Sequence, residues 1–133
     1  KRMQIYPVGS RPSQRASPDY FAGTVWQDPI TMAPEPARLN ALILHFEPSA
    51  RTAWHTHPLG QTLHITQGSG LICKRGEKPQ KIQAGDSVWI PANIEHWHGA
   101  GPTTHMTHIA IQETKEGSAA MWLEHVTDQD YKA

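Results

Sequence analysis

The chain has 133 residues, and its 12 Lys and Arg residues are balanced by 12 Asp and Glu residues. This length suits a single domain, which buries roughly two-thirds of the surface that its unfolded chain exposes. The balanced charge, without a long run of one sign, excludes a strongly basic nucleic-acid-binding or membrane-surface protein and favours a small, neutral ligand.

The N-terminal segment is polar and rich in turn-forming residues. Its first stretch, "KRMQIYPVGS", has no apolar run long enough for a signal peptide or a membrane span, so we expect a cytoplasmic protein without a membrane partner. We interpret residues 1–23 as an N-terminal arm, which a partner subunit orders in a homo-oligomer, a dimer or a tetramer. Residues 24–133 are then the folded body with a short C-terminal segment.

Short strands separated by Gly and Pro dominate the rest of the chain. The second candidate strand places Leu42, Leu44 and Phe46 on one face, and the only expected helix is a short turn near "TDQDY", capped by Thr127. This pattern predicts an all-β domain, and a closed barrel or jelly roll hides its strand edges best. The candidate strands cover residues 24–30, 38–48, 61–70, 70–83, 86–91 and 103–113.

Three of the nine histidines have the spacing of metal ligands. His55 and His57 are two residues apart, so on a strand both imidazoles point to the same face, and His96 follows a second turn in "IPANIEHWHGA". Imidazole is a ligand for Mn, Fe, Ni, Cu and Zn. Three imidazoles and one oxygen leave coordination positions open for water or substrate.

Two segments resemble the two motifs of the cupin family. Residues 55–68, "HTHPLGQTLHITQG", are similar to the first motif, and residues 85–100, "GDSVWIPANIEHWHGA", are similar to the second. The resemblance implies a single-domain cupin jelly-roll barrel with a metal bound by His55, His57, Gln61 and His96. Two further positions depart from the family pattern, because Asn93 replaces a glycine and Ala100 replaces an asparagine.

One subgroup of cupins is closer than the family in general. The stretches "ARTAWHTHPLGQTL", "HWHGAGPTTHMTHIAIQE" and "EHVTDQDY" resemble the bacterial cupin-type hydroxynitrile lyases, which depend on manganese and cleave or form (R)-cyanohydrins. The resemblance implies a lyase that acts on a small-molecule substrate. It also implies one divalent transition metal per chain, with Mn²⁺ as first choice and Fe²⁺, Ni²⁺ or Zn²⁺ as alternatives.

Gln61 occupies the position at which the family has a carboxylate. A neutral amide beside three neutral imidazoles leaves the full dipositive charge of a bound metal uncancelled. Such a metal polarises a substrate oxygen or holds an anion more strongly, while its oxidation is less favoured. This favours redox-neutral lyase chemistry over oxygen activation, unless Gln61 is a structural residue that points elsewhere.

A lyase also needs a group that accepts a proton. The alternation in "TTHMTHIAIQ" places Met106, His108, Ala110 and Gln112 on one face, and the resemblance implies that this face lines the pocket. His108 is then the expected catalytic base, and His98, on the same strand face as His96, is a second base or a hydrogen-bond donor to a ligand. The predicted substrate-binding residues are Leu42, Leu44, Phe46, Leu63, Met106 and Gln112.

The remaining histidines and two tryptophans have simpler interpretations. Trp54 and Trp97 flank metal ligands on the opposite strand face, so we expect them to pack or to contact another subunit. Four histidines lie opposite the expected interior or near the C-terminus and are interpreted as solvated or interface residues, namely His45, His64, His105 and His125.

Two alternatives to the lyase remain open from the residues alone. One is a metal-dependent oxygenase, isomerase or decarboxylase acting on a small enol or keto acid, since cupins carry all of these activities on one ligand set. Against an acidic substrate, Arg51 is the only arginine beside the motifs at the expected site. The other alternative is a non-enzymatic module that binds a metal or a small ligand.

Overall fold

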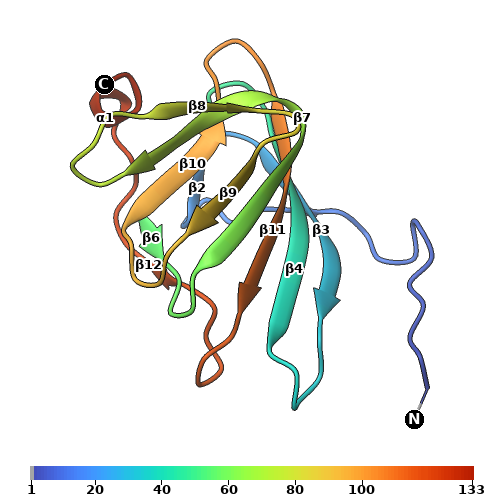
Figure 1. Cartoon of the computed structure of the whole chain (residues 1–133). Helices are drawn as coiled ribbons and strands as arrows, with labels where there is room; N and C mark the ends of the chain where they lie inside the picture. The colour runs from blue at the N-terminus through green and yellow to red at the C-terminus, as the bar shows by residue number, and fades with distance from the viewer. Residues whose placement is uncertain (1) are drawn as a thin grey trace.

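The computed structural model describes residues 2–133 and consists almost entirely of strands (Figure 1). This confirms the prediction of a single all-β domain. The elements are β1 (Gln14–Arg15), β2 (Phe21–Ala22), β3 (Val25–Met32), β4 (Leu39–Phe46), β5 (Arg51–Thr52), β6 (His55–Thr56), β7 (Gln61–Lys74), β8 (Gln80–Gln83), β9 (Ser87–Ile90), β10 (His96–Ala100), β11 (Met106–Glu113), β12 (Met121–Trp122) and α1 (Asp128–Tyr131).

The strands form two layers that share the long strand β7. The pairing order is β1-β3-β4-β11-β7-β10-β5-β2, with β8 and β9 also paired to β7, and with β6 and β12 attached beside β10. The first half of β7 pairs with β11 and the second half with β10. Gly68 lies where β7 passes from one layer to the other; its φ is 72°, and a Cβ there would strike the His105 carbonyl.

Two apolar clusters stabilise the fold. The main cluster lies between the layers and includes Phe46, Leu63 and Met106, each at most 1% exposed. Trp54 and Trp97 belong to a second cluster beneath the C-terminal segment, so both tryptophans pack within this chain. The predicted cap of α1 is confirmed, because the Thr127 hydroxyl accepts a hydrogen bond from the Asp130 N–H at 3.0 Å.

Part of the segment predicted as an arm belongs to the sheets. The strand β1 pairs with β3, β2 pairs with β5, and Phe21 is buried in the main cluster. Residues before Gln14 run along and away from the barrel, and Met3, Ile5 and Val8 are exposed (Figure 1). Assembly into a dimer or tetramer stays a prediction. Within residues 2–133, no helix has the length and apolarity needed to cross a membrane.

Candidate metal centre and its cavity

Three histidines meet where β6 and β10 pair. His55 and His96 are direct neighbours in the antiparallel ladder, and His98 lies two residues further along β10 on the same face. One ring nitrogen from each of the three lies within 4.8 Å of the others. His57 is the next histidine out, with its ring centroid 5.0 Å from that of His55.

Backbone carbonyls set the tautomers of these imidazoles. The Nδ1 atoms of His55, His57 and His96 lie 2.9, 2.7 and 2.8 Å from the carbonyl oxygens of residues 53, 119 and 94. A carbonyl oxygen only accepts, so each Nδ1 carries the proton and each Nε2 presents a lone pair. Nε2 of His57 and of His96 is therefore a buried lone pair without a partner. Such orphaned lone pairs are costly unless a metal engages them, so the donor set fits a metal ion.

Burial also keeps these imidazoles uncharged. It lowers the pKa of His96 to about 4, and it lowers the pKa of His57 as well. The pKa of His55 is well below its usual value because of burial and, next, because of the neighbouring His96. A neutral imidazole is the form that binds a metal, so the site is prepared for one at neutral pH.

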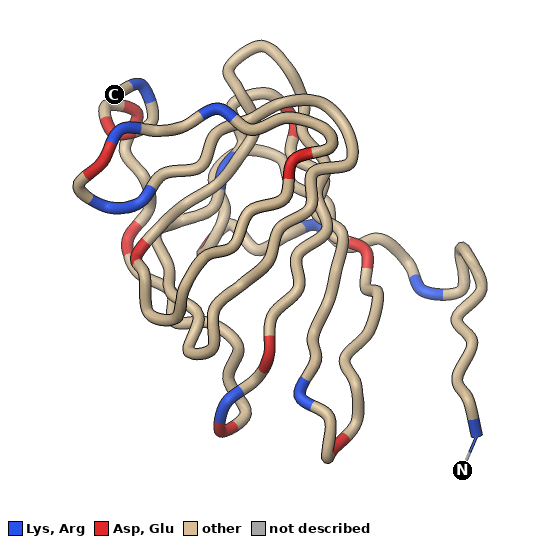
Figure 2. The backbone as a smooth tube through the Cα atoms, in the orientation of Figure 1, with Lys and Arg blue, Asp and Glu red and all other residues tan. Residues whose placement is uncertain are grey.

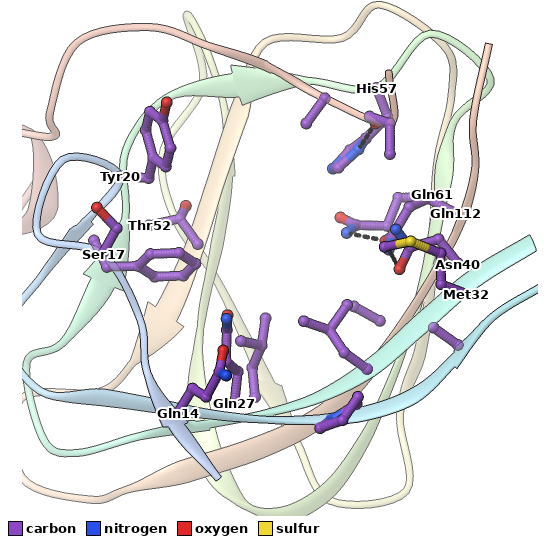
Figure 3. A pocket seen from close by; sticks show the side chains of 18 of the residues that line it. Gln14, Ser17, Tyr20, Gln27, Met32, Asn40, Thr52, His57, Gln61 and Gln112 are labelled. Carbon is purple, nitrogen blue, oxygen red and sulfur yellow. Dashed lines mark hydrogen bonds between the residues drawn. The ribbon is translucent and has the colours of Figure 1, made fainter. Parts of the chain in front are cut away.

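The predicted oxygen ligand belongs to a row of carboxamides. Gln61, Gln112 and Asn40 lie opposite one another on β7, β11 and β4. The Gln61 Nε2 donates to the Gln112 Oε1 at 2.9 Å, and the Gln112 Nε2 donates to the Asn40 Oδ1 at 3.3 Å (Figure 3). The Gln61 Oε1 is left buried without a partner, as the oxygen of a metal ligand would be.

The cluster of ring nitrogens contains two of the four predicted ligands, His55 and His96, and adds His98. His57 and Gln61 each present a buried donor atom without a partner, and their role as ligands stays a prediction. Asn93, which replaces the family glycine, has a φ of 64°, a left-handed conformation that Asn tolerates. Its N–H donates to the His57 carbonyl at 2.9 Å. This hydrogen bond joins the loop before β10 to the loop that follows β6.

His108 and His98 form a pair behind the metal site. His108 is completely buried, and its Nε2 lies 3.0 Å from the His98 Nδ1. Burial lowers the pKa of His108 to about 3, and burial, followed by the neighbouring His108, places the pKa of His98 well below its usual value. His98 lines the cavity whereas His108 does not, so His108 reaches the cavity through His98.

A cavity of about 890 Å³ opens above the histidines. Of the six predicted substrate-binding residues, Leu42, Leu44 and Gln112 line it. Phe46, Leu63 and Met106 are buried in the apolar cluster behind its wall. The alternation read from the sequence of β11 holds, because Met106 and Gln112 are both buried on the inner side.

Several lining residues come from segments that the sequence motifs do not include. The Trp122 ring stacks on His55 at 4.6 Å and on Tyr20 at 4.7 Å. Arg11 and Gln14, from the N-terminal segment, also line the cavity. These contacts join residues far apart in the chain, so the local spacing of residues in the sequence could not predict them.

Arg51, the arginine expected beside the site, points elsewhere. Its guanidinium donates to the Asp128 Oδ1 at 2.8 Å and to the Val126 carbonyl at 3.0 Å, and it lies over the Tyr131 ring. It fastens the C-terminal segment to β5. The nearby Thr52 lines the cavity and accepts a hydrogen bond from the backbone N–H of His98 at 3.2 Å.

Comparison with known proteins agrees with this geometry. An (R)-mandelonitrile lyase of Granulicella tundricola is 52% identical over 130 residues, which are 98% of this chain and 99% of the relative. An acireductone dioxygenase of Yersinia pestis is 31% identical over 93 residues, covering 68% of this chain and 49% of the relative. The chain therefore matches about half the length of that dioxygenase.

Solved structures share the fold. A cupin-like protein of Thermotoga maritima superposes with a TM-score of 0.86 at 37% identity, over 95% of each chain. A polyketide cyclase of Streptomyces resistomycificus, at 12% identity and a TM-score of 0.76, shares the fold alone. The family model described as the cupin domain matches residues 42–111, which run from within β4 to within β11 and include every predicted metal ligand. The chain belongs to the cupin domain family.

Proposed function

We propose that this chain is a metal-dependent, hydroxynitrile lyase-like enzyme that cleaves or forms (R)-cyanohydrins. The observation that carries the proposal is the group of buried Nε2 atoms without partners beside a cavity, in a chain 52% identical to an (R)-mandelonitrile lyase. The cavity wall combines Leu42 and Leu44 with the aromatic rings of Tyr20 and Trp122. Such a wall suits an aromatic or aliphatic carbonyl compound.

The metal ligands in this proposal are His55, His57, Gln61 and His96, with Mn²⁺ as the expected ion. A divalent ion bound there would supply Lewis-acid polarisation of a substrate oxygen and a charge that attracts cyanide. The neutral Gln61 amide leaves that charge uncancelled. The carboxamide row from Asn40 to Gln61 orients the amide oxygen towards the histidines.

The chain's own proton carrier is the pair of His98 and His108. We assign the Nε2 of His98, a residue that lines the cavity, as the atom that takes the cyanohydrin hydroxyl proton and returns it to the departing cyanide. His108 holds the His98 ring through the 3.0 Å contact, in which its Nε2 accepts the hydrogen bond of the His98 Nδ1–H. The resemblance implies that His108 is the base. In this proposal His98 accepts the proton, and His108 acts by positioning His98.

Anaerobic turnover of mandelonitrile tests the proposal. The Mn²⁺-loaded protein is expected to release benzaldehyde and cyanide without oxygen, with (R)-mandelonitrile preferred over its mirror image. The chelator-treated protein serves as the control and should lose the activity. Absence of cyanohydrin turnover with Mn²⁺, Fe²⁺, Ni²⁺ and Zn²⁺ would refute the lyase.

A second candidate is oxygen-dependent cleavage of a small enol. The similarity to an acireductone dioxygenase favours it, because that relative is 31% identical over the part of the chain that it matches. Oxygen uptake by the metal-loaded protein in the presence of an acireductone, without cyanohydrin turnover, would establish this activity instead. Metal binding with neither reaction would indicate a non-enzymatic binding module.

A further inference from the structure

The cavity is larger than the reacting end of a small cyanohydrin requires. Its volume of about 890 Å³ lies high in the range of roughly 300–1,000 Å³ found for sites that hold drug-sized ligands. His57, Gln61 and Gln112 form one polar wall, and Gln14 and Gln27 lie across the cavity from it (Figure 3). A ligand that fills the cavity therefore meets polar side chains at two separate places.

Arg11 supplies a positive charge to this cavity. Its Nη2 donates to the Ile30 carbonyl at 3.2 Å, and its guanidinium carbon lies 4.0 Å from the centroid of the Tyr6 ring. These two contacts position the group, while a guanidinium has five N–H donors in all. Most of its hydrogen-bonding capacity therefore remains available to a ligand.

No carboxylate competes for Arg11 within residues 2–133. None of the ion pairs formed by these residues includes Arg11, and no Asp or Glu lines the cavity. Figure 2 shows Lys, Arg, Asp and Glu concentrated in loops and at strand ends, away from the middle of β4, β7, β10 and β11. An anion that enters the cavity thus meets a guanidinium and no side chain of its own charge.

Two side-chain amides line the same cavity, and one of them, Gln14, is three residues from Arg11. Gln14 and Gln27 are direct partners in the β1–β3 ladder, and both line the cavity together with Arg11. Side-chain amides donate hydrogen bonds to carboxylate oxygens, and the planar guanidinium matches a carboxylate with two parallel hydrogen bonds. Each of the three side chains thus carries donors that suit a carboxylate.

We propose that Arg11, Gln14 and Gln27 form an anion subsite that binds a substrate carboxylate remote from the reacting carbon. This inference rests on the proposed function, and it names the substrate class as an aldehyde, or its cyanohydrin, that bears a carboxylate. From the sequence, Arg51 was the only arginine expected beside the site, which spoke against an acidic substrate. Arg11, from the N-terminal segment, supplies the positive charge that such a substrate needs.

Equilibrium binding in the absence of cyanide tests the subsite without any turnover. Isothermal titration calorimetry compares 4-formylbenzoate with benzaldehyde, two aldehydes that differ by one carboxylate. We expect the native protein to prefer 4-formylbenzoate, and Arg11→Gln to reduce this preference about three- to tenfold. Arg11→Lys should keep part of it, because the charge remains while the planar fork is lost.

Arg15 provides a matched control on the same segment. It is exposed, donates to the Thr24 hydroxyl at 3.2 Å and does not line the cavity. Arg15→Gln removes the same charge and should leave the preference unchanged. An equal loss in both variants would mean a general charge effect and would overturn the subsite, as would an unchanged preference in Arg11→Gln.

A repeat with chelator-treated protein separates this subsite from the metal centre. A carboxylate bound by the metal would lose its advantage on chelation, whereas one bound by Arg11 keeps it. Loss of the preference together with the metal would overturn the subsite. If 4-formylbenzoate is preferred through Arg11 while no cyanohydrin is cleaved, the lyase proposal fails and the subsite stands.

Discussion

Gln61 and Gln112 lie directly opposite each other on β7 and β11, and the Gln61 amide nitrogen donates to the Gln112 Oε1 at 2.9 Å. This hydrogen bond fixes which end of the Gln61 amide faces the histidines. A neutral ligand can present either its oxygen or its nitrogen, and only the oxygen binds a cation. Gln112 is therefore a positioning residue for the expected metal.

Replacement of Gln112 tests this role. Gln112→Leu should weaken Mn²⁺ binding about tenfold, because the Gln61 amide is then free to turn its nitrogen towards the metal. Gln112→Glu keeps an acceptor for that nitrogen and should retain the affinity. Gln27→Leu is the control from the opposite wall. Titration calorimetry with Mn²⁺ measures all three, and native affinity in Gln112→Leu would contradict the role.

A carboxylate in place of Gln61 should change anion binding. Gln61→Glu is expected to retain the metal and to weaken cyanide binding, since its negative charge cancels part of the metal's charge. Absorption spectra of the Co²⁺-loaded protein during a cyanide titration report the affinity. Tighter cyanide binding in the variant would refute this account of Gln61.

Substitutions at three histidines separate metal binding from proton transfer. His55→Ala should lose both metal and cyanohydrin cleavage. His98→Ala and His108→Ala should keep one metal per chain and lose activity by about 10²- to 10⁴-fold, the usual contribution of a general base. Metal analysis and mandelonitrile turnover give the two readouts. Loss of the metal in His98→Ala would make His98 a ligand, as its place beside His55 and His96 allows.

Acid should destabilise the metal-free protein over a defined range of pH. The pKa of His96 is lowered to about 4 in the folded protein, while an unfolded histidine titrates near 6.5. Between these values the unfolded chain binds the extra proton, so stability falls as the pH falls through this range. The slope is about 1.4 kcal/mol per pH unit for each such histidine.

Urea unfolding of chelator-treated protein at several pH values measures this slope. His96→Gln should reduce it by the share of one histidine, while native His55, His57, His98 and His108 still contribute. His64→Gln, at an exposed position, serves as the control. A free energy of unfolding that is constant from pH 7 to pH 5 would contradict the prediction.

The sequence by itself determined the all-β fold and which residues share a face of β11. Alternation with a period of two is a local property, so Met106, His108, Ala110 and Gln112 could be assigned to one side without knowing the strand partners. The motif around His55 and His57 likewise marked the region in which the buried histidines gather. In a strand, residues two apart point to the same face, so the faces of these side chains follow from their spacing alone.

Only the tertiary structure decided what surrounds those histidines. The pairing of β6 with β10 brings His55 against His96 and His98, and the pairing of β11 with β7 brings Gln112 against Gln61. Such contacts join segments far apart in the chain, and local periodicity carries no information on strand register. For the same reason the sequence pointed to Arg51 for a charge beside the site, whereas the fold brings Arg11 to the cavity.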